Sequence, residues 1–229
     1  MSFLPKIPKN NRKNAAKSAR RGAYYPREND RQSSMRKNYV CLFAFVLLAV
    51  FFSCTSAPRR TDGSCSRELR APGVKSAEQL AQFFLSHNGD VRQADILRLA
   101  RYYVAEAAAE GINADVAFVQ MCLETGWLQF GNLVTPDMYN FCGLGAMDAE
   151  HPGEYFPTEQ IGVRAHIQHL QAYATTEDVK LHHALVDPRY DWVHKAKFAR
   201  TVSDLAGQWA TDKQYGEKLD RLLAELETF

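Results

Sequence analysis

Helical spacing of apolar residues dominates the chain from Ser76 onward, apart from a polar connection with Asp and His before residue 198 and one long interruption. Apolar positions recur every three or four residues, which places them on one face of an α-helix. The stretches with this spacing run over residues 76–84, 94–110, 113–124, 158–173, 198–209 and 212–226. Ser76 begins a capping box with Gln79, Asn113 or Asp115 can begin the third helix, and Gly111 is a natural helix stop. We therefore expect a mainly α-helical domain.

The interruption covers residues 126–157 and contains five glycines, three prolines and several aromatic residues. Glycine and proline at this density favour turns over helices. A loop of this length inside a compact domain is usually functional. We therefore expect a mainly α (α+β) fold, with an irregular or β-containing lobe after the helix that ends at Glu124.

The net charge of +2 hides two segments of opposite sign. Residues 1–53 hold 11 Lys and Arg against 2 Asp and Glu, whereas residues 54–229 hold 17 against 24. The first segment therefore carries +9 and the second −7. An acidic domain argues against nucleic-acid binding through a basic patch. It does not exclude an uncharged glycan as ligand.

The N-terminal segment has the features of an export signal. Residues 1–34 are polar and basic, which predicts disorder, and Met35 is an alternative start. Residues 39–52 form an apolar stretch of 14 residues, shorter than the roughly 20 that span a membrane but suited to a signal peptide. Ser53-Cys54 then resembles the lipobox of bacterial lipoproteins, although Phe51 and Phe52 depart from its usual aliphatic lead.

This resemblance implies cleavage before Cys54 and a lipid on its thiol. The alternatives are a plain signal peptide, or a buried helix with a chance cysteine. The predicted organisation is a basic leader at 1–34, a signal peptide at 35–53, a tether at 54–75 and a catalytic domain at 76–229. The expected location is the bacterial cell envelope, anchored to a membrane by lipid.

Cysteine and histidine spacing gives no metal-binding pattern. Cys65, Cys122 and Cys142 remain after the signal, and no pair has CxxC spacing. Cys122 and Cys142 can pair in an oxidising compartment, but we favour small buried residues. His166 and His169 lack an HExxH context. We therefore expect no metal and no cofactor.

Glu124 is the strongest candidate for chemistry. Cleavage of a glycosidic bond needs an acid, and a glutamate serves when an apolar site raises its pKa. Glu124 ends an apolar helix just before Thr125-Gly126-Trp127, where a core helix meets a cleft. The alternative is an exposed residue at a helix end, which the helix dipole disfavours slightly.

Three segments, in order, carry a family resemblance. Residues 120–127 (QMCLETGW) resemble the Q-x-x-L-E-[ST]-G-W signature of the peptidoglycan glucosaminidases of glycoside hydrolase family 73. Residues 139–144 resemble that family's N-[LF]-F-G-[IL] element, with Cys142 replacing an apolar aromatic residue. Residues 209–219 resemble its late Y-A-T-D-x-x-Y-x-x-K-[IL] element, with Trp209 replacing tyrosine. The resemblance implies a lysozyme-like fold.

The resemblance also implies site residues. Glu124 matches the general acid, and Tyr215 matches a tyrosine near it. The second catalytic group varies in the family, and Glu159 is the first candidate here. The remaining acidic candidates are Asp148, Glu150 and Glu154, and Tyr215 or the substrate's acetamido group is a further alternative. We expect the substrate to be bound by Gln120, Trp127, Tyr139, Asn140 and Phe141, although Trp127 can be a core residue and Asn140 can serve only a turn.

The implied function is hydrolysis of the β-1,4 bond after N-acetylglucosamine in peptidoglycan strands. An N-acetylmuramidase or lytic transglycosylase on the same scaffold is the close alternative. A glycan-binding lipoprotein without catalysis is a third reading, and retention of Glu124, Trp127 and Tyr215 counts against it.

Overall fold

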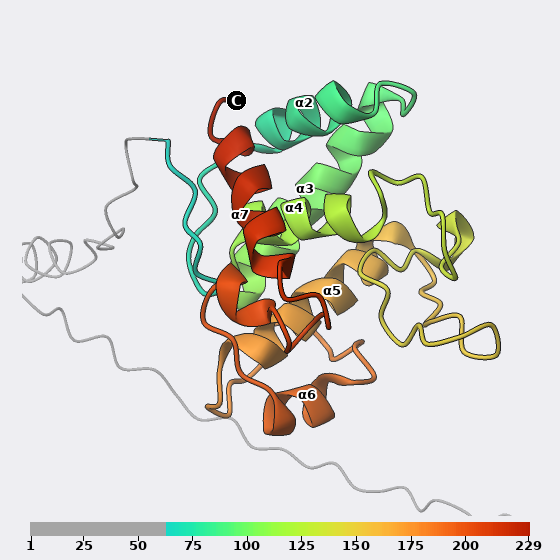
Figure 1. Ribbon diagram of the computed structural model, residues 1–229, viewed down its shortest axis with the longest axis vertical. Helices are drawn as coiled ribbons and strands as arrows, with labels where there is room; N and C mark the ends of the chain where they lie inside the picture. Colours follow the sequence, from blue (N-terminus) through green and yellow to red (C-terminus); the bar gives the residue numbers. More distant parts are fainter. Residues whose placement is uncertain (1–62) are drawn as a thin grey trace, which may run out of the picture. The chain divides into compact units, whose positions relative to one another are not determined.

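The computed structural model describes residues 63–229, and these are mainly helical, as predicted. Residues 1–62, with the predicted signal and Cys54, lie outside the described part. The α-helices are α2 (Ala77–His87), α3 (Gln93–Glu110), α4 (Ala114–Glu124), α5 (Glu159–Ala174), α6 (Tyr190–Ala196) and α7 (Tyr215–Leu226). Two 3₁₀ helices, η1 (Pro136–Met138) and η2 (Val202–Leu205), lie between them. Figure 1 shows their arrangement.

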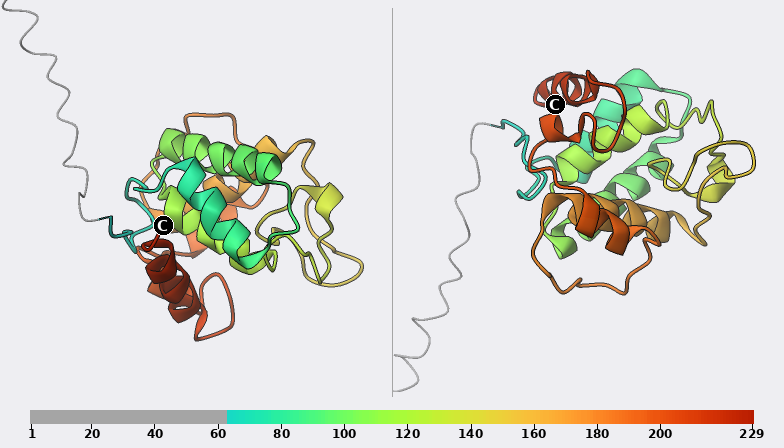
Figure 2. Two further views of the ribbon diagram at one scale, coloured as in Figure 1. Left: turned by 90° about the horizontal axis from the view of Figure 1, so that it is seen from above. Right: turned by 60° about the horizontal axis from the view of Figure 1, so that its bottom comes forward.

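Helix α4 lies in the middle of the bundle, with α2 and α7 on one side and α5 and α6 on the other (Figures 1 and 2). Every residue from Ala114 to Cys122 is buried. A helix that is buried on all sides, with only Asp115 and Gln120 as polar residues in this stretch, must be surrounded by other elements. The last residue of α4 is Glu124, so the central helix delivers a carboxylate to the edge of the core.

Local capping explains where these helices begin and end. Ser76 makes the predicted capping box with Gln79, and Asn113 rather than Asp115 caps α4. Gly111 ends α3 in the left-handed region, with φ 69°. Thr158 caps α5 through the backbone N–H of Ile161. Side-chain caps satisfy backbone N–H groups that a helix start leaves unpaired.

The segment between α4 and α5 forms an irregular lobe that projects from one side of the bundle (Figure 2). Within residues 125–158 it contains η1 and one isolated β-bridge between Asp148 and His151, but no strand. Gly162 fixes the lobe against α5. A Cβ there would lie 1.8 Å from the carbonyl oxygen of Tyr139, so only glycine permits this approach.

The predicted helix at 198–209 is wrong. The structure has α6 earlier, in a stretch we interpreted as a polar connection, and only η2 inside the predicted range. Val202 and Leu205 give this range its apolar spacing by packing into the core. Gly207 then turns the chain with φ 78°. The last helix begins at Tyr215 instead of Asp212.

The domain begins before the predicted boundary at Ser76. Cys65 and Leu69 are both buried in the core. The Leu69 N–H donates to the carbonyl of Arg200, and the Asn113 N–H donates to the carbonyl of Leu69. Residues 63–75 therefore pack as part of the domain and are held by backbone hydrogen bonds. The helical spacing of apolar residues in the sequence could not predict these bonds.

The three cysteines of residues 63–229 are free and buried, in line with the reading we favoured. In the same part of the chain, no group of three or more His, Cys, Asp or Glu side chains is arranged to hold a metal ion. None of its helices combines the length and the apolar character needed to cross a membrane.

Candidate active site

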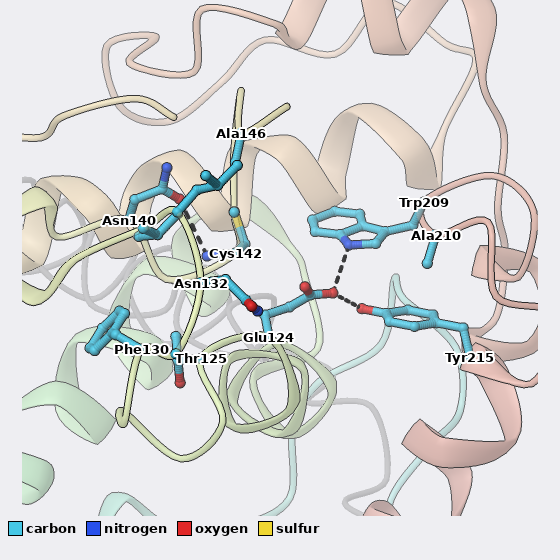
Figure 3. Close-up of a pocket in the computed structure, with 14 residues that line it drawn as sticks. Glu124, Thr125, Phe130, Asn132, Asn140, Cys142, Ala146, Trp209, Ala210 and Tyr215 are labelled. Atoms are coloured by element: carbon cyan, nitrogen blue, oxygen red, sulfur yellow. Dashed lines mark hydrogen bonds between the residues drawn. The ribbon is translucent and has the colours of Figure 1, made fainter. Parts of the chain in front are cut away.

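Glu124 is held by two hydrogen-bond donors that reach it from the C-terminal part of the chain (Figure 3). Its Oε1 accepts a hydrogen bond from Trp209 Nε1–H at 2.9 Å and another from the Tyr215 hydroxyl. Within residues 63–229, no hydrogen bond to Glu124 Oε2 is found. When the carboxyl is protonated, its proton therefore belongs on Oε2.

The surroundings favour this protonated form. Burial raises the pKa of Glu124 above its usual range, because a charged carboxylate loses hydration in the core. The hydrogen bonds from Tyr215 and Trp209 act in the opposite direction and lower that pKa. Burial is the larger effect, so Glu124 retains its proton to a higher pH than an exposed glutamate. A general acid needs this property.

Behind Glu124 runs a chain of buried hydrogen bonds with a fixed direction. The Tyr215 hydroxyl accepts from Gln120 Nε2 at 2.9 Å, and Gln120 Oε1 lies 3.0 Å from His166 Nε2. Since an amide oxygen only accepts, His166 Nε2 carries the hydrogen. Burial lowers the pKa of His166 to about 3, so the ring is neutral and its Nδ1 accepts from the Tyr103 hydroxyl at 2.9 Å.

Because the Tyr215 hydroxyl oxygen accepts from Gln120, the hydroxyl hydrogen is donated to Glu124. Burial, together with the Glu124 charge, raises the pKa of Tyr215 well above its usual range, so the phenol stays protonated. The chain therefore keeps a donor aimed at Glu124 Oε1.

Trp209 is fixed by an aromatic surround. Its ring centroid lies 5.9 Å from that of His166, 5.1 Å from His169 and 5.4 Å from Tyr173. His169 is oriented in turn by a 2.8 Å contact between its Nδ1 and the buried Asp187. These contacts hold the indole N–H against Glu124 at the position where the family pattern has tyrosine.

Glu124 lines a cavity of about 350 Å³, which we call the acid pocket. Its lining residues are Glu124, Thr125, Phe130, Gly131, Asn132, Leu133, Val134, Asn140, Cys142, Gly143, Ala146, Trp209, Ala210 and Tyr215. Among these described residues Glu124 is the only carboxylate. The volume is in the range of small-ligand sites.

The structure does not bring Glu159 to the acid pocket. Its two carboxylate oxygens accept from the Arg98 guanidinium at 2.9 and 3.0 Å, and it lines a different cavity. The three remaining acidic candidates, Asp148, Glu150 and Glu154, also lie outside the acid-pocket lining. Asp148 binds the side chain of His151, and the backbone of Glu154 fastens the lobe. The structure therefore places none of these carboxylates opposite Glu124.

Gln120 and Asn140 have internal roles in place of the predicted substrate contacts. Gln120 is completely buried and serves the chain behind Tyr215. Asn140 lines the acid pocket, but its amide is already fully used. Its Nδ2 donates to the carbonyls of Leu144 and Glu154, and its Oδ1 accepts from the Leu144 N–H. The turn interpretation of Asn140 is therefore the one that its contacts support.

The predicted aromatic contacts divide in two. Trp127 packs on α2, stacked on His87 with centroids 3.8 Å apart, so it is a packing residue. Tyr139 and Phe141 line the largely apolar cavity, of about 410 Å³, that Glu159 also lines. Phe130 lines this cavity and the acid pocket, so the two are neighbours.

Two important residues had no predicted role in catalysis. Trp209 lies inside the motif at residues 209–219, where it replaces tyrosine. This replacement was the sequence feature that could have indicated its role. His166 had been considered only as a metal ligand. Its position on the buried face of α5 was the available signal, because a buried histidine needs hydrogen-bond partners.

Comparison with known proteins identifies the family of the chain. The family model described as Glucosaminidase, mannosyl-glycoprotein endo-beta-N-acetylglucosaminidase, matches residues 100–228. The chain belongs to the glucosaminidase family. The matched part of this glucosaminidase includes Glu124, Trp209 and Tyr215. Membership makes it a glycoside hydrolase and supports hydrolysis of peptidoglycan glycan in general.

A protein of Borreliella burgdorferi named "Uncharacterized protein" is similar to this glucosaminidase, with 38% identity over 158 residues. The aligned part covers 69% of this chain and 76% of that protein. No solved structure matches the chain.

Proposed function

We propose that this glucosaminidase, as a member of glycoside hydrolase family 73, hydrolyses the β-1,4 bond after N-acetylglucosamine in peptidoglycan. One observation carries the proposal: Glu124 is a carboxylic acid of raised pKa in a cavity, with two donors on Oε1 and, within residues 63–229, none on Oε2. The motif at residues 120–127 supports the choice of bond.

Protonation of the leaving oxygen comes from Glu124 Oε2. Because the acid pocket holds no other carboxylate among its described residues, the acetamido oxygen of N-acetylglucosamine attacks the anomeric carbon as the glycosidic C–O bond breaks. A water molecule then attacks the anomeric carbon and opens the cyclic intermediate, while the Glu124 carboxylate takes the proton that this water loses. Tyr215 and Trp209 stabilise the carboxylate between these steps.

A lytic transglycosylase is the second candidate, because a lone acid also suits that reaction. There the muramic acid 6-hydroxyl replaces water and yields an anhydro-muramic end. An N-acetylmuramidase would cut the other glycosidic bond of the repeat. Mass spectrometry of digested sacculi separates all three: our proposal predicts N-acetylglucosamine at the new reducing ends. Anhydro-muramic acid or reducing muramic acid as the main end would contradict it.

We further propose that the enzyme is a lipoprotein of the cell envelope, anchored through Cys54. The apolar stretch at 39–52 followed by Ser53-Cys54 supports this location. Growth with an alkyne fatty acid should label the wild type and leave Cys54→Ser unlabelled. Equal labelling of both proteins would contradict the anchor.

A further inference from the structure

A second cavity, of about 260 Å³, lies beside the acid pocket. The two cavities share Cys142, Gly143, Ala146 and Trp209 as lining residues. A ligand that reaches Glu124 is therefore next to this second cavity. We call it the basic cavity, because its lining includes Arg189 and Lys197.

The two cations of the basic cavity lack anionic partners. Within residues 63–229, neither the Arg189 guanidinium nor the Lys197 ammonium makes a salt bridge, and no Asp or Glu lines the cavity. The buried Asp187 is already used by His169 Nδ1 and by the backbone N–H of Arg189. Two unpaired cations in one hollow of an acidic domain indicate a site for an anion.

Arg189 and Lys197 flank helix α6 as its N-cap and C-cap residues, on the face that also carries Trp192 and Val193. Arg189, Trp192 and Val193 follow helical spacing, and Lys197 comes one turn later. Val193 is buried and anchors this face, whereas Trp192 is 55% exposed. The Arg189 guanidinium lies 5.5 Å from the centroid of the Trp192 ring. This contact orients the guanidinium while leaving its N–H groups available.

We propose that the basic cavity binds the carboxylate carried by the muramic acid substituent, either the lactyl carboxylate or one on the stem peptide. The inference rests on the proposed function, since it names the part of peptidoglycan that lies beside the cleaved bond. Guanidinium and ammonium groups are the donors that suit a carboxylate. An extended residue spans about 3.3–3.6 Å, so carboxylates near the sugar can reach a neighbouring cavity.

Direct binding tests this without requiring cleavage. The full chain carrying Glu124→Gln is titrated with three probes of equal sugar length: N-acetylglucosamine oligomers, glycan stripped of stems, and stem-bearing glycan. We expect at least one carboxylate-bearing probe to bind about tenfold tighter than the uncharged oligomer. Preference for stripped glycan identifies the lactyl carboxylate, and preference for stem-bearing glycan identifies the peptide.

Substitutions that each remove one positive charge, inside or outside the basic cavity, provide the matched comparison. Lys197→Gln and Arg189→Gln should each reduce this preference several-fold, and added salt should weaken it. Lys195→Gln removes the same charge from α6 outside the cavity lining and should leave the preference unchanged. Equal binding of all three probes would overturn the proposal. So would a preference that survives both cavity substitutions in proteins with unchanged melting temperatures.

The failure of this inference is distinguishable from failure of the proposed function. If the wild type cleaves sacculi but binding of the probes does not depend on their charge, only the proposal of a carboxylate site in the basic cavity is wrong. If the wild type does not cleave sacculi but binding of the probes depends on their charge, the hydrolase proposal is wrong and the carboxylate site is still supported.

Discussion

Replacing Tyr215 with phenylalanine should move the pH dependence of catalysis upward. The tyrosine is 5% exposed, so phenylalanine keeps the ring packing and deletes only the hydroxyl. Glu124 Oε1 then keeps the Trp209 hydrogen bond alone. Since the lost hydrogen bond lowers the pKa of Glu124, its removal raises that pKa.

The size of the shift follows from the bond that is lost. A hydrogen bond to a charged group contributes about 1.5–3 kcal/mol. One pKa unit corresponds to about 1.4 kcal/mol, so the pKa of Glu124 should rise by roughly 1–2 units. The active form is the protonated acid, so the basic limb of kcat/KM should move up by the same amount. The maximal rate should fall, because the carboxylate formed in the reaction loses a donor.

The assay is the pH profile of kcat/KM on soluble peptidoglycan strands. Tyr190→Phe is the matched control, because Tyr190 is also buried but donates its hydroxyl to Gln171, and neither residue lines the acid pocket. Its basic limb should coincide with that of the wild type. If the basic limb of Tyr215→Phe stays in place or moves to lower pH, Glu124 is not the acid that this limb reports.

Three further substitutions test other parts of the structure. The pKa of Glu124 is raised in the folded protein. Its contribution to the free energy of unfolding is therefore complete below the pKa of the unfolded chain and is lost as the pH rises through the folded pKa. Glu124→Gln should remove this pH-dependent loss of stability, measured in thermal melts from pH 4 to 8. His166→Phe leaves two buried polar partners unsatisfied and should lower the free energy of unfolding by about 2 kcal/mol or more in urea titrations. Gly162→Ala should destabilise by about 3 kcal/mol through its clash with the Tyr139 carbonyl, whereas Gly89→Ala, where a Cβ meets only an ordinary 3.8 Å contact, should be nearly neutral.

Capping signals made most helices predictable. Ser76, Gly111 and Thr158 mark boundaries because each satisfies backbone groups locally, and local chemistry is visible in sequence. Helix α6 was missed because it has seven residues and no side-chain cap at Arg189. The apolar spacing at 198–209 was misleading, since tertiary packing rather than a helix buries those residues.

The site was predictable only for residues that lie within the sequence motifs. Glu124 and Tyr215 are 91 positions apart, and the order of motifs indicated that they meet. Glu159 does not join them because it lies at the start of α5, where it lines another cavity and its carboxylate binds Arg98. Gln120 shows the general difficulty: a polar side chain in a motif serves the fold or the ligand equally well until its hydrogen bonds are known.

The central claim is that Glu124 supplies the acid and that Glu159 takes no part. The most direct test measures kcat/KM on purified sacculi for the wild type, Glu124→Gln and Glu159→Gln. Loss of a general acid should reduce the rate by about 10²–10⁴-fold. Glu159→Gln should stay within about twofold of the wild type, because it removes only a surface ion pair with Arg98. Full activity in Glu124→Gln, or an equal loss in both variants, would contradict the account.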